Sequence, residues 1–103
     1  MEKRDNRRKR IRVTLSAEPG SIRAFTGDLS YNGLFVVSAK VLPPGTRIRL
    51  QVHTKEGVAL GVGVVRWARR VPMEVMRDIK GGMGVEFTWI SAELKKFIDG
   101  NMG

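Results

Sequence analysis

Short segments in which apolar and polar residues alternate recur along this chain, and residues that interrupt regular structure separate them. Segments 10–16 and 48–52 are the clearest examples, with apolar residues at every second position. A period of two places alternate side chains on opposite faces of a β-strand, so each segment predicts a strand with one buried face. Between them, Pro43-Pro44-Gly45 excludes a helix or a central strand. These features favour an all-β fold of short strands.

Six strands and one C-terminal helix account for the pattern of the whole chain. The expected strands are 10–16, 21–29, 34–38, 48–52, 58–69 and a sixth that begins at Gly81-Gly82. The helix is expected at 91–100, with Ser91 as N-cap, an apolar face that includes Leu94 and Ile98, and Gly100 at its end. Residues 71–80 read as a loop with one helical turn at 73–77. The sequence therefore predicts a single domain, 1–103, in which residues 10–90 form a six-stranded antiparallel β-barrel against which the helix packs.

The apolar positions also predict which strand faces form the core. In the fifth strand the apolar set shifts by one residue, as at a β-bulge or where a strand passes from one sheet to another. This set is Val58, Leu60, Val62 and Val64, then Val65 and Trp67. The core face of the sixth strand is Met83, Val85, Phe87 and Trp89. Gly84 is expected at a close packing contact or a bulge, both tryptophans in the core, and the apolar third strand buried on both faces. Trp67 lies near enough to the bulge to reach the edge of a ligand.

Composition narrows the class of protein. The 103 residues suffice for one hydrophobic core, there is no cysteine, and no apolar run approaches the ~20 residues that cross a bilayer. The basic N-terminus lacks the apolar stretch of a secretory signal, so a cytoplasmic location is expected. His53 is the single histidine, and neither a catalytic triad nor a metal site can be assembled around it. We expect a binding protein without a metal or cofactor rather than an enzyme, with His53 in a structural role.

Positive charge is concentrated at the N-terminus. Residues 1–12 contain seven basic and two acidic residues. Their net charge of +5 is more than half of the +9 of the whole chain. Residues 1–9 have no apolar residue after Met1 and no periodicity, so they are expected to form a flexible basic arm. Such an arm favours an anionic partner: nucleic acid, a nucleotide or an anionic membrane.

Two motifs carry groups that bind ligands. Arg8 and Arg12 lie four residues apart, which in an extended chain places them on one side, about 13 Å from each other. Guanidinium groups bind phosphate and the O6/N7 edge of guanine, and they stack on bases. The segment 28–33 lies between two apolar runs, as is typical of a turn, and supplies the Asp28 carboxylate, the Ser30 hydroxyl and the bare backbone of Gly33. Taken singly, the first motif is equally typical of a solvated tail and the second of a hairpin connection.

Together, Arg8-x-x-x-Arg12 and Asp28-x-Ser30-x-x-Gly33 resemble the paired signature of the PilZ domain, a family of bacterial receptors for cyclic di-GMP. Segments 42–46, 63–67 and 82–87 resemble later strands of that family, so the resemblance covers nearly the whole chain.

The resemblance implies a six-stranded β-barrel and a role for each motif residue. Arg8 and Arg12 would bind phosphates and guanines, Asp28 and Ser30 would bond polar edges of the ligand, and Gly33 would permit the turn and a close backbone approach. Some members carry a further arginine before the pair and bind a stacked ligand dimer. Arg7 occupies that position, which implies two ligand molecules per domain.

The hypothesis that follows is a cyclic di-GMP receptor without catalysis. Binding would order the arm and remodel a surface that an unidentified downstream protein reads, in motility, adhesion, exopolysaccharide production or virulence. A basic nucleic-acid-binding β-barrel is an alternative, although residues 21–39 contain one arginine and no lysine, and no exposed aromatic ladder is apparent. A PilZ-like protein-interaction module in pilus assembly is a third possibility, against which the intact motifs argue.

Overall fold

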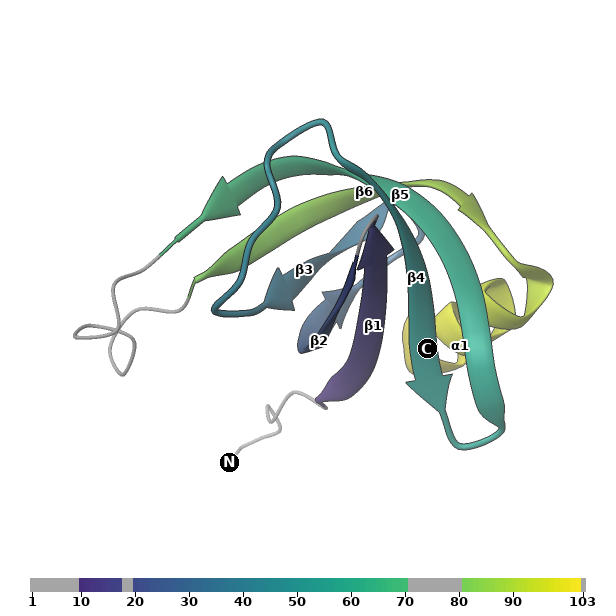
Figure 1. Cartoon of the computed structure of the whole chain (residues 1–103). Coiled ribbons are helices and arrows are strands. Elements are labelled where there is room, and N and C mark those ends of the chain that lie inside the picture. Colours follow the sequence, from purple (N-terminus) through teal and green to yellow (C-terminus); the bar gives the residue numbers. More distant parts are fainter. Residues whose placement is uncertain (1–9, 18–19, 71–80, 103) are drawn as a thin grey trace, which may run out of the picture.

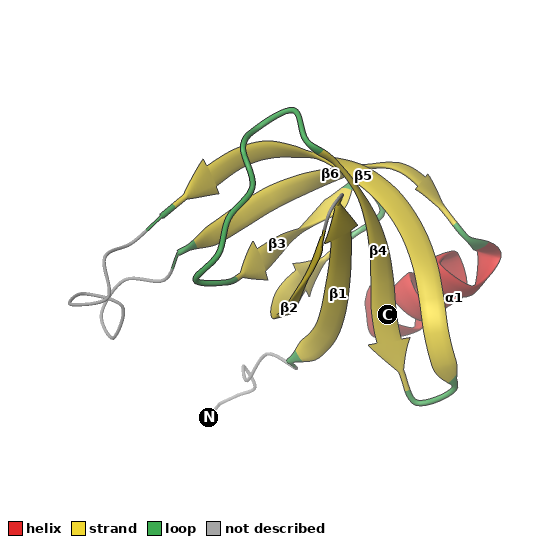
Figure 2. Ribbon diagram, viewed as in Figure 1, coloured by secondary structure: helices red, strands yellow, loops and turns green. Residues whose placement is uncertain are grey.

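The computed structural model describes residues 10–17, 20–70 and 81–102, and in them the chain forms six strands and one helix (Figures 1 and 2). The strands are β1 (Ile11–Ala17), β2 (Gly20–Leu29), β3 (Gly33–Val37), β4 (Arg47–Thr54), β5 (Gly57–Arg69) and β6 (Gly82–Ile90). The helix α1 covers Ala92–Met102. The predicted arm at 1–9, which contains Arg7 and Arg8, and the predicted loop at 71–80 lie outside the described residues.

The strands close into a barrel. Their order is β1-β2-β3-β6-β5-β4, every neighbouring pair is antiparallel, and β1 completes the circle by pairing with β4. β5 is the longest strand and arches together with β6 over the other strands (Figure 1). The predicted all-β, six-stranded antiparallel barrel is confirmed.

Side chains that point inward from all six strands form one hydrophobic core, and α1 adds Leu94 and Ile98 to it. Ser91 is the N-cap, as predicted, because its hydroxyl oxygen accepts a hydrogen bond from the Leu94 N–H at 3.1 Å. The predicted end of the helix at Gly100 is wrong, since α1 continues to Met102. Gly100 does not adopt the positive φ with which glycine ends helices, so it is an ordinary residue of the last turns. No helix in the described part of the chain has the length and apolar character needed to span a bilayer.

Two bulges between β5 and β6 decide where the tryptophans lie. Thr88 is the extra residue of one bulge and Arg66 that of the other. An extra residue turns the following side chain to the opposite face of the strand. Trp89 therefore leaves the core face of β6 and is 54% exposed, while Trp67 is 46% exposed. A bulge is present in this part of β5, but it lies at Arg66 and not between Val64 and Val65, where the sequence pattern shifts. The prediction that both tryptophans belong to the core is wrong.

The core face of β5 is also the reverse of the predicted one. Its inward positions are the small residues Ala59, Gly61 and Gly63, followed by Val65, and the larger aliphatic side chains at 58, 60, 62 and 64 point outward. The reason lies in the rest of the core. A Cβ on Gly61 would lie 3.1 Å from Leu94 Cδ2, and one on Gly63 would lie 2.8 Å from Val85 Cγ1, so α1 and β6 already fill this space.

The third strand is likewise buried less than predicted. Leu34 and Val36 are buried, whereas Phe35 and Val37 are only half-buried and point to the outer surface of the barrel. Closure of the barrel explains the difference, because a closed sheet has one core face and its other face meets solvent.

Candidate functional site

The turn between β2 and β3 is held by its own side chains. A bulge at Gly27 shifts the β2–β3 register, and Thr26 Oγ1 accepts a hydrogen bond from the Asp28 N–H at 3.2 Å. The Ser30 hydroxyl donates to the Gly33 carbonyl at 3.3 Å and accepts from the Asn32 N–H at 3.3 Å. The Asp28 carboxylate is exposed and has no hydrogen bond or ion pair with the described residues. Its oxygens therefore remain able to accept hydrogen bonds from a ligand.

At Gly33 the backbone of β3 lies close against that of β6. A Cβ at this position would be 2.0 Å from the Val85 carbonyl oxygen and 3.0 Å from its carbonyl carbon. The neighbour that approaches Gly33 is thus the backbone of β6. Because any side chain here would force the two strands apart, glycine is required for the turn to sit against the barrel.

Two aromatic rings meet beside this turn. Phe35 on β3 and Trp67 on β5 both pair with Gly84 on β6, which lies between them. Their rings stack above the glycine with centroids 5.2 Å apart and planes inclined by 18°. A Cβ on Gly84 would lie 2.1 Å from Trp67 Nε1, so the close packing predicted for this glycine is confirmed. The missing side chain creates the space that the indole occupies.

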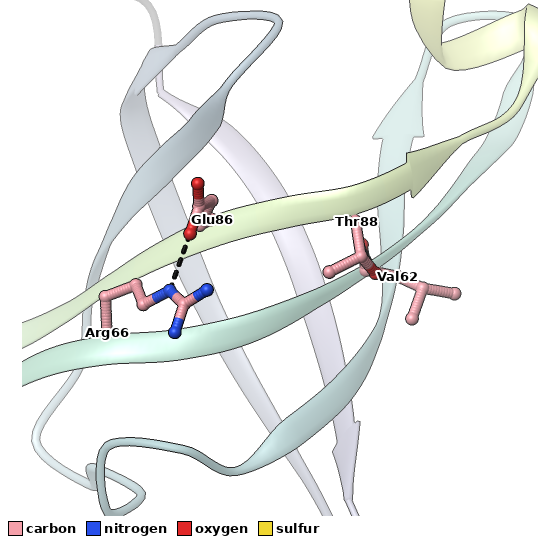
Figure 3. Close-up of polar contacts among 4 residues, drawn as sticks. All are labelled: Val62, Arg66, Glu86 and Thr88. Carbon is pink, nitrogen blue, oxygen red and sulfur yellow. Dashed lines mark hydrogen bonds and ion pairs between the residues drawn. The ribbon is translucent and has the colours of Figure 1, made fainter.

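An ion pair borders the aromatic stack. Arg66 Nε donates to Glu86 Oε1 at 2.5 Å, between β5 and β6, and both side chains are exposed (Figure 3). Exposed pairs of this kind contribute only ~0–1 kcal/mol to stability. The Arg66 guanidinium is therefore free to exchange Glu86 for an anionic ligand at little cost.

These groups share one open hollow of about 360 Å³ in the outer surface of the barrel. The residues that line it include Asp28, Ser30 and Gly33 from the motif, Phe35 and Trp67 from the stack, and Arg66 with Glu86. The hollow combines a flat aromatic surface, a carboxylate acceptor and a guanidinium donor. That combination suits a planar heterocycle that carries N–H donors and lies near an anionic group.

The arginine motif lies only partly within the described residues. Arg12 is exposed on β1, on the face opposite the core, as predicted. It lines a different hollow, of about 730 Å³, together with Arg10, Lys55 and Lys96. The structure therefore brings Asp28, Ser30 and Gly33 together but does not place Arg12 beside them.

The start of β1 nevertheless lies on the same side of the barrel as the motif turn. Ile11 pairs with Thr26, two residues before Asp28 on the neighbouring strand. Arg10 lies over the ring of Phe25, with Cζ 5.5 Å from the ring centroid. Arg10, the first described residue, thus lies next to the strand that carries Asp28. His53, beside Arg12 in the second hollow, is half-buried and hydrogen-bonded to Thr14 Oγ1 at 3.0 Å, in keeping with its predicted structural role.

Sequence reasoning missed Phe35 and Arg66 as members of the site. The one-residue shift in the apolar pattern indicated a bulge near Trp67, but it lies between Val64 and Val65 and did not mark Arg66 as the bulged residue. No such signal identified Phe35, because it meets Trp67 only through the register of three strands.

The family model of the PilZ domain matches residues 2–100 of this chain. No curated protein matches it. Among solved structures, the inhibitor of motility MotI/DgrA of Bacillus subtilis is similar, with a TM-score of 0.66 and 24% sequence identity. The similarity covers 87% of this chain and 43% of that protein, and at this identity it shows a shared fold. Because the family model spans almost the whole barrel and its helix, the chain belongs to the PilZ domain family.

Proposed function

We propose that this protein binds cyclic di-GMP in the hollow beside the β2–β3 turn and transmits binding to a partner protein. The observation that carries the proposal is the shared hollow itself. It joins the exposed Asp28 carboxylate to the Phe35–Trp67 stack and to Arg66, in a chain that belongs to the PilZ family.

Each group in the hollow has a counterpart on the ligand. Guanine presents N–H donors on one edge, which an exposed carboxylate such as that of Asp28 accepts. Its O6 and N7 accept from an arginine fork, and its flat face stacks on an aromatic ring. The two phosphates require cations, which Arg8, Arg12 and Arg66 supply. The ligand would thereby bridge the two motifs, and Arg7 would serve a second, stacked ligand molecule.

Competition binding tests this proposal. Labelled cyclic di-GMP is challenged with cyclic di-AMP, GTP and a short DNA duplex at about 150 mM salt, where long-range electrostatics are largely screened. We expect a wide preference for cyclic di-GMP, because adenine presents an amino donor where guanine presents O6 and would leave arginine donors unpaired. A nucleic-acid-binding arm reads phosphates alone and would be saturated by the duplex.

Two variants test whether the ligand measured in this competition binds in the hollow. Asp28→Ala and Ser30→Ala are each expected to weaken the cyclic di-GMP complex and to leave any DNA binding unchanged. Ser30 also holds the turn, so its variant is read together with a thermal melt. Displacement of the label by DNA as effectively as by cyclic di-GMP, with no effect of either variant, would overturn the receptor assignment. Absence of any nucleotide binding would instead favour a protein-interaction module.

The aromatic stack gives a prediction of its own. Trp67→Leu is expected to lower cyclic di-GMP affinity roughly tenfold or more, because stacking of a base on an aromatic ring is worth ~1–3 kcal/mol. Trp89→Leu is the matched control, since Trp89 is similarly exposed but lies outside the hollow. Equal affinities for the two variants, measured by calorimetry, would remove Trp67 from the site.

Ligand binding is also expected to order the arm. Mutual repulsion among the arginines and lysine at 7–10 opposes a compact arm without an anion. Bound phosphates would neutralise that charge. Backbone NMR order parameters of residues 4–12 should therefore rise when cyclic di-GMP is added. Identical order parameters in both states would contradict this mode of signalling.

A further inference from the structure

A stripe of exposed apolar side chains runs along the outer face of β5 and continues onto β6. Val58 and Leu60 are each 48% exposed, and Trp89 is 54% exposed. Val62, half-buried, lies between Leu60 and Trp89 because it precedes Gly63 on β5 and pairs with Trp89 across the sheet. We call this set, with Arg47 and Arg49 on the adjoining β4, the β5 face. Contiguous exposed apolar surface of this kind marks interaction sites.

The stripe is built into the barrel and does not depend on a loose side chain. The Thr88 hydroxyl donates to the Val62 carbonyl at 3.2 Å, and both residues are drawn in Figure 3. This bond spans the bulge after which Trp89 faces outward. The backbone of Leu60 is anchored to Ser91 by two hydrogen bonds, since its N–H donates to Ser91 Oγ at 3.2 Å and its carbonyl accepts from the Ser91 N–H at 2.9 Å. The apolar side chains therefore present a fixed surface to a partner.

On the β4 side, the charge beside the stripe has one sign. The outward residues of β4 next to β5 are Arg47, Arg49, Gln51 and His53, and none is acidic. Arg49 pairs with Val62 of the stripe, and Arg47 pairs with Val64, the next outward residue of β5. On its other side Val64 pairs with Glu86, whose carboxylate is already ion-paired with Arg66. Neither Arg47 nor Arg49 forms an ion pair with the described residues. A partner must therefore place apolar side chains beside carboxylates.

Backbone pairing restricts how a partner can bind. Along the stripe β5 pairs with β4 on one side, and from Gly61 onward with β6 on the other. Before Gly61 this edge of β5 is covered at Leu60 by Ser91, so among the described residues only 57–59 have no strand partner on that side, a stretch too short for an added β-strand. Contact must therefore be made through side chains. An amphipathic helix with an acidic flank meets this requirement.

We propose that the β5 face is a docking surface for an acidic amphipathic helix of a partner protein. A second copy of this chain is a poor occupant, because each copy carries a net charge of +9 and the same two arginines. A lipid surface also fits poorly. Valine and leucine side chains in the middle of strands, beside longer arginines, do not protrude into a bilayer. The proposal does not rest on nucleotide binding, since the β5 face shares no residue with the hollow beside the β2–β3 turn and only Val58, which the test leaves unchanged, with the second hollow.

The probe is a synthetic helical peptide of about 18 residues, with leucines along one face and glutamates on its flanks. A scrambled peptide of identical composition lacks the apolar face and reports nonspecific attraction to a basic protein. With the folded protein at about 150 mM salt, the patterned peptide is expected to bind at least tenfold more tightly than the scrambled one. NMR shift changes should fall on β4, β5 and Trp89.

Two sets of variants decide the proposal. Leu60→Ser and Trp89→Ser leave the charge unchanged and should each weaken patterned-peptide binding about tenfold. Arg47→Gln with Arg49→Gln should weaken it clearly more than Arg23→Gln with Lys40→Gln, a control pair that removes the same charge at exposed sites elsewhere. Circular dichroism checks that each variant is folded.

Several outcomes would overturn the inference. One is peptide binding that is insensitive to Leu60 and Trp89, and another is an equal response to the two arginine–lysine variant pairs. Binding of anionic phospholipid vesicles through Trp89 without peptide binding would assign the face to a membrane. Sedimentation that shows a dimer lost in Leu60→Ser would assign it to a second copy. Cyclic di-GMP titration of the same variants should remain unchanged, which separates failure here from failure of the proposed nucleotide site.

Discussion

Replacing Arg8 and Arg12 together by alanine is expected to lower the affinity for cyclic di-GMP more than a hundredfold. Each guanidinium is proposed to make charge-assisted hydrogen bonds, and loss of one such contact costs roughly 1.5–3 kcal/mol. If the two contacts are independent, the losses add to about 3–6 kcal/mol. Arg12 points away from the core, so the fold should be retained. Calorimetric titration measures the affinity, and a thermal melt checks the fold.

A charge-matched control makes this result specific. Arg23→Ala with Lys40→Ala removes the same charge from exposed positions outside both motifs and both hollows. If the protein only attracts anions through its net charge, the two double variants will lose affinity equally, and the arginine motif will have no special role. The single variant Arg12→Ala then tests whether the second hollow takes part. An unchanged titration by this variant would remove Arg12 from the binding site.

Gly33→Ala is expected to destabilise the barrel by about 3 kcal/mol. The new Cβ would lie 2.0 Å from the Val85 carbonyl oxygen, a backbone atom that moves only if β3 and β6 separate. In a domain of this size 1 kcal/mol shifts the midpoint of thermal unfolding by about 4–8 °C. Thermal and urea unfolding, followed by circular dichroism, should therefore show a large loss.

Gly20→Ala is the control for this variant. Gly20 also lies in a strand, at the start of β2, but a Cβ there would have no atom within 4 Å. We expect no loss of stability at Gly20, and a slight gain from the reduced freedom of the unfolded chain is compatible with this. Equal stability of both variants would show that β3 can move away from β6 freely. The close approach of Gly33 would then have no structural role.

Local patterns in the sequence were sufficient for the strands, the barrel and the helix start. Alternation in β1 and β4 identified Leu15 and Leu50 as buried, and both are fully so. Ser91 was recognisable as an N-cap because capping depends only on residues within one turn. The motif turn at 28–33 was also predictable, since Asp, Ser, Asn and Gly between apolar runs favour a turn locally.

The same local reasoning failed where the core is shared between distant segments. Val58 and Leu60 are as apolar as any core residue, yet the interior beside them is filled by Leu94 and Val85, so small residues face inward instead. Trp89 continues the alternation of apolar residues in β6 and still faces solvent. The bulge at Thr88 turns the side chain that follows it to the opposite face of the strand. Neither the inward small residues of β5 nor the bulge before Trp89 can be predicted from the strand's own sequence, because both depend on other parts of the fold.

The sequence alone determined that this chain forms a barrel, and it identified the two motifs that point to a nucleotide ligand. Periodicity and turn chemistry act over a few residues, and for that reason they can be read without the fold. The tertiary structure alone decided that Phe35 and Trp67 stack over Gly84 beside Asp28, and that Arg12 faces another hollow. These placements depend on the registers of β3, β5 and β6, which are set by how all six strands pack together in the closed barrel.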